Sequence, residues 1–265
     1  MKRLELFEFE DYNWLPDFIR SGLTKLIVIL HRAMGTADVI TSLILHIKQK
    51  CAFDQVIDLG SGSGGPMLDV MQRLDLNKNK LHLILTDLYP NPKTVEKINA
   101  KKLEHVSYQE TSLNATNINN APKGLKTMIA SFHHMKPKIA KKILQSAQDN
   151  KSPILIYEIA KNNIPTLIWW LLLPLSLIIL IAMSLVMTLF VRPLSLTQII
   201  FTYIIPIIPI TYAWDGQASL MRTYTFDDIK TILPEQQDHY VWVIEDAKKS
   251  NGKTLGYYIM GYPKP

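Results

Sequence analysis

Two spacings of hydrophobic residues alternate along the first 160 residues of the chain. Short apolar runs predict buried strands, and between them apolar residues return every three to four positions, which is typical of helices packed on a sheet. Strands are predicted at 53–59, 81–86, 106–110, 127–131 and 154–159, and helices at 17–34, about 36–47, about 66–74, after Asn91, and at 137–149. Strands that alternate with helices predict an α/β, doubly wound parallel sheet.

The C-terminal part of the chain predicts a different kind of connection. Residues 240–246 and 255–262 have the pattern of strands, and Asn251-Gly252 between them is typical of a hairpin turn. Thr225 and Asp228 form a capping-box-like start of a short helix before this pair. We therefore expect a mostly parallel, seven-stranded sheet with an antiparallel last strand.

The stretch that carries the chemistry is VIDLGSGSGGP, residues 56–66. It predicts a buried strand that ends in a glycine-rich turn, followed by a helix that begins near Pro66. Gly60, Gly62 and Gly64 have no Cβ, so a ligand can approach the backbone N–H groups of the turn closely. The spacing indicates a nucleotide-type cofactor. Because Gly60, Gly62 and Gly65 also satisfy G-x-G-x-x-G, the glycines alone leave a dinucleotide site open.

Asp58, two positions before the first glycine, separates these two kinds of cofactor. A carboxylate there can accept a hydrogen bond from a cationic amine, whereas a pyrophosphate would be repelled by it. The stretch resembles the first motif of the class I S-adenosylmethionine-dependent methyltransferases, which reads hydrophobic-hydrophobic-Asp/Glu-x-Gly-x-Gly-x-Gly. The resemblance implies a Rossmann-like methyltransferase fold, S-adenosyl-L-methionine as the cofactor, and methyl transfer. The alternative is a glycine-rich strand–helix turn without a ligand.

The other residues expected to bind the cofactor follow the next two strands. Asp87 lies at the distance from the glycines at which a carboxylate reaches ribose hydroxyls. Class I enzymes often place an acidic residue against the adenine amino group after the third strand. This chain has Asn114 near that position, so the contact would be a neutral amide. The full predicted set is Asp58, Gly60, Ser61, Gly62, Gly64, Asp87, Leu88 and Asn114.

Three residues are candidates for proton transfer. His133 and His134 follow the fourth predicted strand, where class I enzymes line the substrate pocket, and Glu158 ends the fifth. A histidine with a pKa near neutrality can take a proton from an attacking hydroxyl or amine. The alternative is that one histidine is packed and the other solvated. Two adjacent histidines without a cysteine or a clear third ligand do not predict a metal site.

An apolar insert separates the fifth strand from the C-terminal part. Residues 164–191 contain no charge, and as a helix this run is longer than the roughly 30 Å hydrocarbon core of a bilayer. After Arg192-Pro193, a second apolar run follows at 199–213. Because the strands on both sides belong to one sheet, the insert must cross a membrane twice or dip in and return. The alternative is a buried helical pair in a soluble core.

Lysines before the insert predict its orientation. They are dense between 136 and 161, whereas Arg192 alone lies at the tip, and the positive-inside bias then puts the catalytic part on the cytoplasmic side. The early W-L-P segment, the F-H-H motif and the D-G-x-x-S-x-L/M-R-x-Y-T segment resemble a group of bacterial class I methyltransferase-like proteins with an apolar insert. This resemblance implies the bacterial inner membrane and says nothing about the methyl acceptor.

The acceptor site is predicted where the insert returns to the sheet. Its residues are Asp215, Ser219, Arg222 and Tyr224, together with Tyr12 and Trp14 of an N-terminal lid. In that interpretation a lipophilic acceptor slides along the insert, and its polar head is held against the methyl donor. The alternative is that Asp215 and Arg222 form a structural ion pair that anchors the insert.

Composition narrows the partners. The chain has one cysteine, Cys51, so it has no intrachain disulfide, and its formal net charge is +6. Because basic and aromatic residues do not interleave, the charge indicates a surface near anionic lipid and no nucleic-acid partner. We expect a lid at 1–50, the cofactor domain at 51–163, the membrane hairpin at 164–213 and the rest of the sheet at 214–265. The expected function of the protein is either methyl transfer to a small lipophilic acceptor or cofactor binding without transfer. A nicotinamide-dependent oxidoreductase activity is a more distant alternative.

Overall fold

The structure is a computed structural model that describes every residue except 1, 236 and 265. Contacts divide the chain into two compact units. The sheet unit comprises residues 35–159 and 226–265, and the helical unit comprises residues 1–34 and 160–225. This division differs from the domain boundaries that the sequence suggested. Helix 17–34 contacts the helices that follow residue 160, whereas the next helix contacts the sheet.

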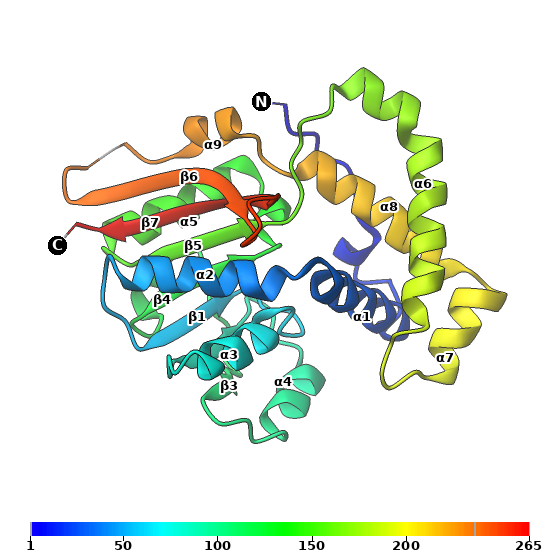
Figure 1. The fold of residues 1–265 in the computed structure, drawn as a ribbon, viewed down its shortest axis with the longest axis horizontal. Coiled ribbons are helices and arrows are strands. Elements are labelled where there is room, and N and C mark those ends of the chain that lie inside the picture. Colours follow the sequence, from blue (N-terminus) through cyan, green and yellow to red (C-terminus); the bar gives the residue numbers. More distant parts are fainter. Residues whose placement is uncertain (1, 236, 265) are drawn as a thin grey trace. The chain divides into compact units, whose positions relative to one another are not determined.

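The sheet unit contains seven strands in the order β3-β2-β1-β4-β5-β7-β6 (Figure 1). The first five are parallel, and β7 pairs antiparallel with both β5 and β6. This confirms the predicted fold class. The strands are β1 (Gln55–Leu59), β2 (His82–Thr86), β3 (Val106–Tyr108), β4 (Leu125–Ile129), β5 (Ile154–Glu158), β6 (Tyr240–Lys248) and β7 (Thr254–Pro263).

Helices cover the sheet and bury its apolar residues. They are α2 (Thr36–Lys48), α3 (Met67–Leu76), α4 (Pro92–Asn99), α5 (Pro137–Asp149) and α9 (Phe226–Ile232), with short 3-10 turns at Ile118–Asn120 and Phe132–His134. Ile40 and Ile44 of α2 pack in one core with Leu74 of α3 and Val56 of β1, and all four are fully buried. Each such side chain stabilises the fold by about 1.5–3 kcal/mol through burial.

Strand β4 begins two residues earlier than the sequence predicted, and it ends at Ile129. It includes Lys126, whose ammonium group is buried but donates to the carbonyl oxygens of Pro122 (2.7 Å) and Gly124 (3.1 Å). Burial lowers the pKa of Lys126 to about 8. After the strand, Ala130 has a φ of 51°, in the left-handed region. The predicted strand at 127–131 therefore ends early because its backbone turns at Ala130.

The helical unit is built around the apolar insert. It contains a 3-10 turn at Phe9–Asp11, α1 (Asp17–Met34), α6 (Thr166–Thr188), α7 (Leu196–Ile199) with a π-helical continuation at Ile200–Ile204, and α8 (Ile207–Arg222). Helices α6 and α8 pack along each other, and α1 contacts both. Among the described residues, α6 is the one helix long and apolar enough to cross a membrane by itself. The number rises to three if each of two bent helix pairs counts as one span.

Candidate functional site

The glycine turn after β1 has the backbone conformation that only glycine adopts without strain. Gly60, Gly62, Gly64 and Gly65 have φ values of 69°, 52°, 91° and 45°. A Cβ on Gly62 or Gly65 would meet no atom within 4 Å, so the turn is open on that side. A ligand can therefore approach the backbone of these two residues at van der Waals distance. Of the other glycines predicted to face the ligand, Gly64 is covered, because a Cβ on it would lie 3.4 Å from Leu85.

Asp58 lies beneath the turn and is buried. Its Oδ1 accepts a hydrogen bond of 2.7 Å from the Thr127 hydroxyl of β4, the residue that is its register partner in the sheet. Burial, with a smaller contribution from the charge of Asp87, raises the pKa of Asp58 to about 6, and hydrogen bonds from Thr127 and Ser61 oppose this shift. A cationic group that reached this carboxylate would stabilise its ionised form.

Asp87 joins the end of β2 to the same turn. Its Oδ2 accepts from the N–H of Gly62 at 3.1 Å, and its Oδ1 accepts from the N–H of Tyr89 at 2.9 Å. On the other side of the turn, the Tyr108 hydroxyl donates to the Gly62 carbonyl oxygen at 2.9 Å. Residues from β1, β2, β3 and β4 therefore converge at the carboxyl edge of the sheet, where open α/β sheets bind ligands.

Ser61 closes the base of the turn and is itself buried. Its hydroxyl donates to the Asp58 carbonyl at 2.8 Å, and its N–H donates to the Thr86 carbonyl at 2.9 Å. Leu88, by contrast, is exposed on the surface after β2. Asn114 uses its side-chain oxygen to accept from the N–H and hydroxyl of Thr116, so this amide oxygen is engaged in a local turn.

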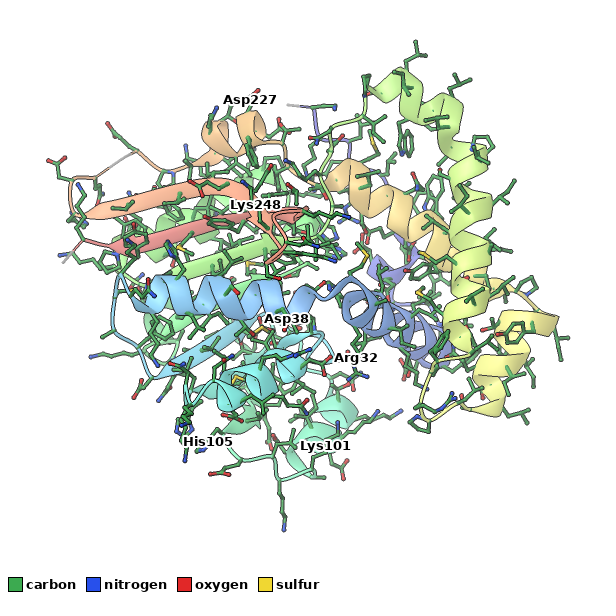
Figure 2. All side chains as sticks on the ribbon, viewed as in Figure 1. Arg32, Asp38, Lys101, His105, Asp227 and Lys248 are labelled. Atoms are coloured by element: carbon green, nitrogen blue, oxygen red, sulfur yellow. The ribbon has the colours of Figure 1, made fainter. Side chains whose placement is uncertain are left out.

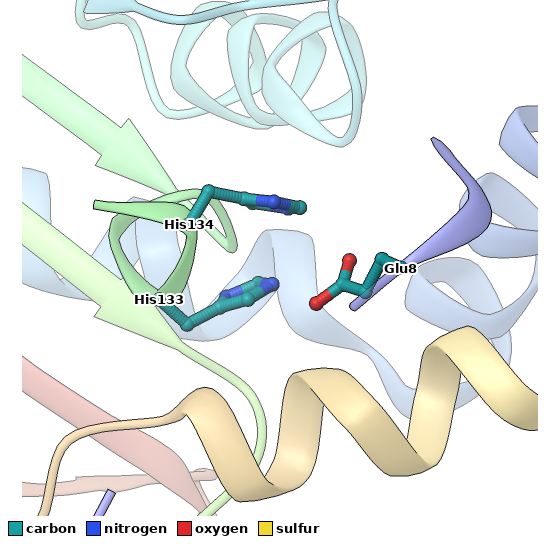
Figure 3. A group of neighbouring side chains, drawn as sticks. All are labelled: Glu8, His133 and His134. Atoms are coloured by element: carbon teal, nitrogen blue, oxygen red, sulfur yellow. The ribbon is translucent and has the colours of Figure 1, made fainter. Parts of the chain in front are cut away.

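His133 and Glu158 form a buried pair at the ends of β4 and β5. The Glu158 carboxylate accepts from the backbone N–H of His133 at 3.0 Å, and its other oxygen lies 2.9 Å from His133 Nδ1. The ring of His134 lies beside that of His133, with 4.3 Å between centroids (Figure 3). The three candidates for proton transfer are therefore brought together, and Glu158 fixes the orientation of His133.

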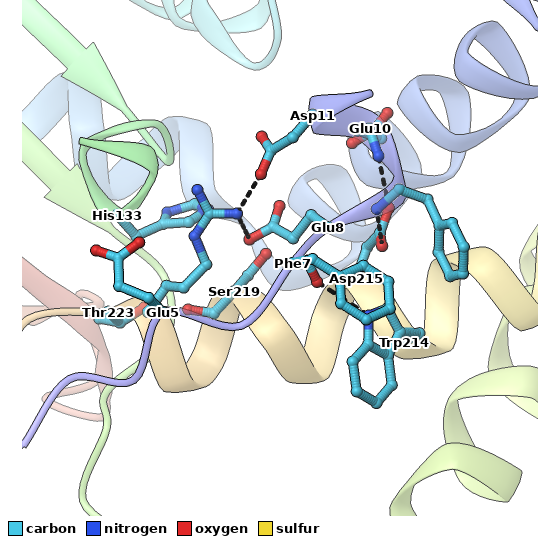
Figure 4. Close-up of polar contacts among 12 residues, drawn as sticks. Glu5, Phe7, Glu8, Glu10, Asp11, His133, Trp214, Asp215, Ser219 and Thr223 are labelled. Carbon is cyan, nitrogen blue, oxygen red and sulfur yellow. Dashed lines mark hydrogen bonds and ion pairs between the residues drawn. The ribbon is translucent and has the colours of Figure 1, made fainter. Parts of the chain in front are cut away.

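The residues predicted to hold the acceptor head are engaged within the helical unit. Arg222 Nη1 lies 3.0 Å from Glu8 and 2.6 Å from Asp11, while Asp215 accepts from the backbone N–H of Phe9 at 2.7 Å (Figure 4). The suggested ion pair between Asp215 and Arg222 is therefore replaced by separate contacts to the N-terminal segment. These contacts attach residues 8–11 to α8. The arginine pairs with the acidic side chains of the N-terminal segment, and Asp215 accepts from its backbone.

The remaining predicted acceptor residues have mixed environments. The Tyr12 and Trp14 rings stack on each other, with 5.9 Å between centroids, and both are exposed. Tyr224 is buried, and the Arg3 guanidinium lies 4.9 Å from its ring centroid. The Ser219 carbonyl oxygen accepts from the Thr223 hydroxyl at 2.8 Å. Whether any of these side chains contacts an acceptor stays a prediction.

Three residues of the sheet unit belong to the site although the sequence did not single them out. Thr127 and Tyr108 contact Asp58 and the glycine turn, as described above. Ser131, directly after Ala130, has a buried hydroxyl oxygen without a hydrogen-bond partner among the described residues. That oxygen lies 4.0 Å from the point where a Cβ on Gly60 would be. In the sequence, only their positions near the ends of predicted strands could have indicated that these residues belong to the site.

Comparison with solved structures bears on the fold of the chain. An O-methyltransferase family 2 protein from Planctomyces limnophilus, in complex with apigenin, superposes with a TM-score of 0.50 at 12% identity. That match covers 96% of this chain and 63% of the other, so the chain spans less than two thirds of that protein. The plantazolicin methyltransferase BpumL in complex with SAH superposes with a TM-score of 0.49 at 11% identity, over 93% and 97% of the two chains.

The fold is that of the class I methyltransferases. No protein-family profile matches the chain, and no curated protein sequence matches it significantly. At identities this low the likeness concerns the class I methyltransferase fold alone, and the chemistry has to be argued from the residues of this chain.

Proposed function

We propose that the protein is an S-adenosylmethionine-dependent methyltransferase that acts on a small lipophilic acceptor at the cytoplasmic face of the bacterial inner membrane. The observation that carries the cofactor assignment is the pair of carboxylates around the open glycine turn. Asp58 lies under it and Asp87 binds the Gly62 N–H from the next strand. Asp58 favours a cationic cofactor and opposes a pyrophosphate, whereas Asp87 suits the ribose of either kind of cofactor.

The residues fit S-adenosylmethionine in three respects. Asp58 offers a buried carboxylate to an ammonium group. Asp87 offers ribose hydroxyls the lone pairs of its two oxygens that the N–H groups of Gly62 and Tyr89 do not use. The open faces of Gly62 and Gly65 give the cofactor room beside the turn. When bound, the cofactor supplies an electrophilic methyl group, so the protein has mainly to orient the acceptor and exclude water.

The acceptor proton would leave through His133. Because Glu158 binds Nδ1, it selects the tautomer in which Nε2 accepts a proton, and it stabilises the protonated ring that results. Glu158 also accepts from the backbone N–H of His133, so the ring is oriented by two contacts to one carboxylate. In this account His133 is the base, Glu158 positions it, and His134 lines the same edge of the sheet.

The membrane and the lipophilic acceptor are supported by the insert. Its long helix, α6, leaves a row of leucines and isoleucines exposed, which a soluble surface would not carry. The positive net charge suits a membrane with anionic lipids, and the lysines before the insert favour a cytoplasmic sheet unit. An acceptor that partitions into lipid would be delivered by the same surface.

A cofactor-binding membrane protein without transfer activity is the second candidate. It is favoured by one observation: Arg222 and Asp215, which were expected to hold the acceptor, are occupied by the N-terminal segment. The two candidates differ in one experiment. Membrane lipid extract is incubated with the detergent-solubilised protein and S-adenosylmethionine labelled in its methyl group. We expect label in a lipid fraction, and we expect His133→Ala to abolish it while cofactor binding persists. Binding without label in any lipid fraction would favour the second candidate.

A further inference from the structure

Helix α6 has two apolar stripes on opposite sides. Trp169, Leu173 and Met187 are buried against the rest of the helical unit, whereas Leu167 and Leu171 are 82% and 79% exposed. Positions two residues apart are about 200° apart around a helix, so the exposed stripe faces directly away from the buried one. The exposed stripe continues along the helix through Leu175, Ile178, Ile179 and Val186, and directly after the helix through Leu189 and Phe190. Figure 2 shows mainly carbon along this helix.

Charged groups lie behind the buried stripe beside the middle of α6. Gly216 of α8 packs there, since a Cβ on it would be 3.6 Å from Leu180. The adjacent Asp215 binds the N–H groups of Phe9 and Glu10. Burial, followed by the charge of Asp215, raises the pKa of Glu10 to about 7. The N-terminal segment with its acidic side chains is thus fixed level with the centre of α6.

Charged residues of α1 also lie near the C-terminal end of α6. Met187 and Val191 pack against Leu23 of α1 and its apolar neighbours. Helix α1 carries Asp17, Arg20, Lys25 and Arg32, and Asp17 and Arg32 are exposed. The polar elements of the helical unit therefore lie on one side of α6 along its length, and the exposed apolar stripe lies on the other.

A membrane-spanning orientation conflicts with this arrangement. If α6 stood perpendicular to the bilayer, the N-terminal segment and its carboxylates would lie at the centre of the hydrocarbon core. A charged side chain at that depth costs at least about 2.5–3.5 kcal/mol on insertion scales. If α6 lies parallel to the membrane plane, the N-terminal segment and α1 lie on the side of α6 away from lipid, and only the exposed stripe meets the acyl chains.

We propose that the helical unit binds one leaflet of a phospholipid bilayer, with α6 lying in the membrane plane and its exposed stripe in the acyl-chain region. This inference rests on the membrane placement of the proposed function and names its mode: the insert dips into the bilayer and does not cross it. Leu196, Ile204 and Ile210, elsewhere in the insert, are also exposed.

The test measures the depth of three positions along the exposed stripe. Cys51→Ser provides a background for the single substitutions Leu171→Cys, Ile178→Cys and Phe190→Cys, each labelled with an environment-sensitive fluorophore. Ser21→Cys on α1 is the control, because Ser21 is exposed on the polar side. The full chain is reconstituted into vesicles of phosphatidylethanolamine and phosphatidylglycerol that contain spin labels at either a shallow or a deep acyl carbon.

We expect all three stripe positions to be quenched by the shallow label more than by the deep one, to similar extents, and Ser21→Cys to be unquenched. Deep quenching confined to Ile178→Cys, with Phe190→Cys protected from a membrane-impermeant quencher, would show that α6 spans the bilayer. Absence of quenching at all three positions would show that protein, such as a second copy of the chain, covers the stripe. Either result overturns the inference. S-Adenosylmethionine binding by the same variants is read separately, so this failure is distinguishable from failure of the proposed enzyme.

Discussion

The two units use their carboxylates differently. In the sheet unit, Asp58 and Asp87 lie around an open turn and contact neighbouring hydroxyl and N–H groups. In the helical unit, Glu8 and Asp11 are paired with one arginine that holds the N-terminal segment on α8. A polar cluster around an open glycine turn and one beside an apolar helix therefore differ in what their carboxylates contact, which is hydroxyl and N–H groups in the first and an arginine in the second. We call the first the open cluster, because there is open space beside Gly62 and Gly65, and the second the closed cluster, because both of its carboxylates pair with Arg222.

We expect the largest effect from a substitution in the closed cluster, which lowers the free energy of unfolding. Arg222→Met removes a cation that lies 3.0 Å from Glu8, a carboxylate whose side chain is 2% exposed, and so weakens the compensation of a buried charge. Losing one member of a buried ion pair costs about 3–5 kcal/mol. We expect a lower free energy of unfolding for the helical unit with unchanged S-adenosylmethionine affinity, measured by thermal unfolding and calorimetry. Arg192→Met, at an exposed arginine, is the control. Normal stability together with lost methyl transfer would instead identify Arg222 as a substrate residue.

The open cluster is tested by a substitution at its turn. Gly62→Val forces a β-branched residue into a left-handed conformation and fills the side on which a ligand would approach. We expect S-adenosylmethionine affinity to fall by about 100-fold or more, from backbone strain and lost space together. Gly252→Val is a matched control, because Gly252 also has a positive φ of 80° and open surroundings but lies in the β6–β7 turn. Equal affinity loss in both variants would show that strain alone is responsible.

A substitution on the exposed surface of the helical unit should have a smaller effect, on the affinity for vesicles. Leu171 in α6 and Leu76 in α3 are 79% and 78% exposed, so they are matched in accessibility and differ in the unit they belong to. We expect Leu171→Asp to weaken binding to anionic vesicles at least about tenfold, because the carboxylate would have to enter the acyl region. Leu76→Asp should leave binding unchanged in a vesicle co-sedimentation assay. Equal behaviour of the two variants would contradict the assignment of a lipid-facing stripe.

A change of pH tests the open cluster, because the affinity for a cationic cofactor should depend on the ionisation of Asp58. Burial raises the pKa of Asp58 to about 6, so the ligand-free protein gains stability from protonation at low pH and loses it as the pH rises through about 6. A cationic cofactor binds the ionised carboxylate and must compete with the proton. We expect affinity to fall roughly tenfold from pH 7 to pH 5, as the ionised fraction of Asp58 drops by that factor. Asp58→Asn should bind weakly at all pH values, and a pH dependence that survives in this variant would exclude Asp58 as its source.

The sequence predicts the strand-end residues of the site because local pattern determines them. Asp58, Asp87 and Glu158 each follow an apolar run, and the parallel sheet brings such ends to one edge. Thr127 could not be found in this way, because its contact with Asp58 depends on the register of β1 against β4. The pairing of Arg222 with Glu8 joins residues more than 200 positions apart, and no local pattern marks it. The sequence therefore predicts the succession of strands and helices better than the partners of individual polar groups.

The central claim is that the turn around Asp58 and Asp87 binds a cationic nucleoside cofactor. Titration calorimetry of the detergent-solubilised full chain, with S-adenosylmethionine and NAD in parallel experiments, tests it most directly. The account predicts saturable binding of S-adenosylmethionine that Asp87→Ala weakens, because the ribose contact is lost, and no measurable binding of NAD. Binding of NAD without binding of S-adenosylmethionine would contradict it.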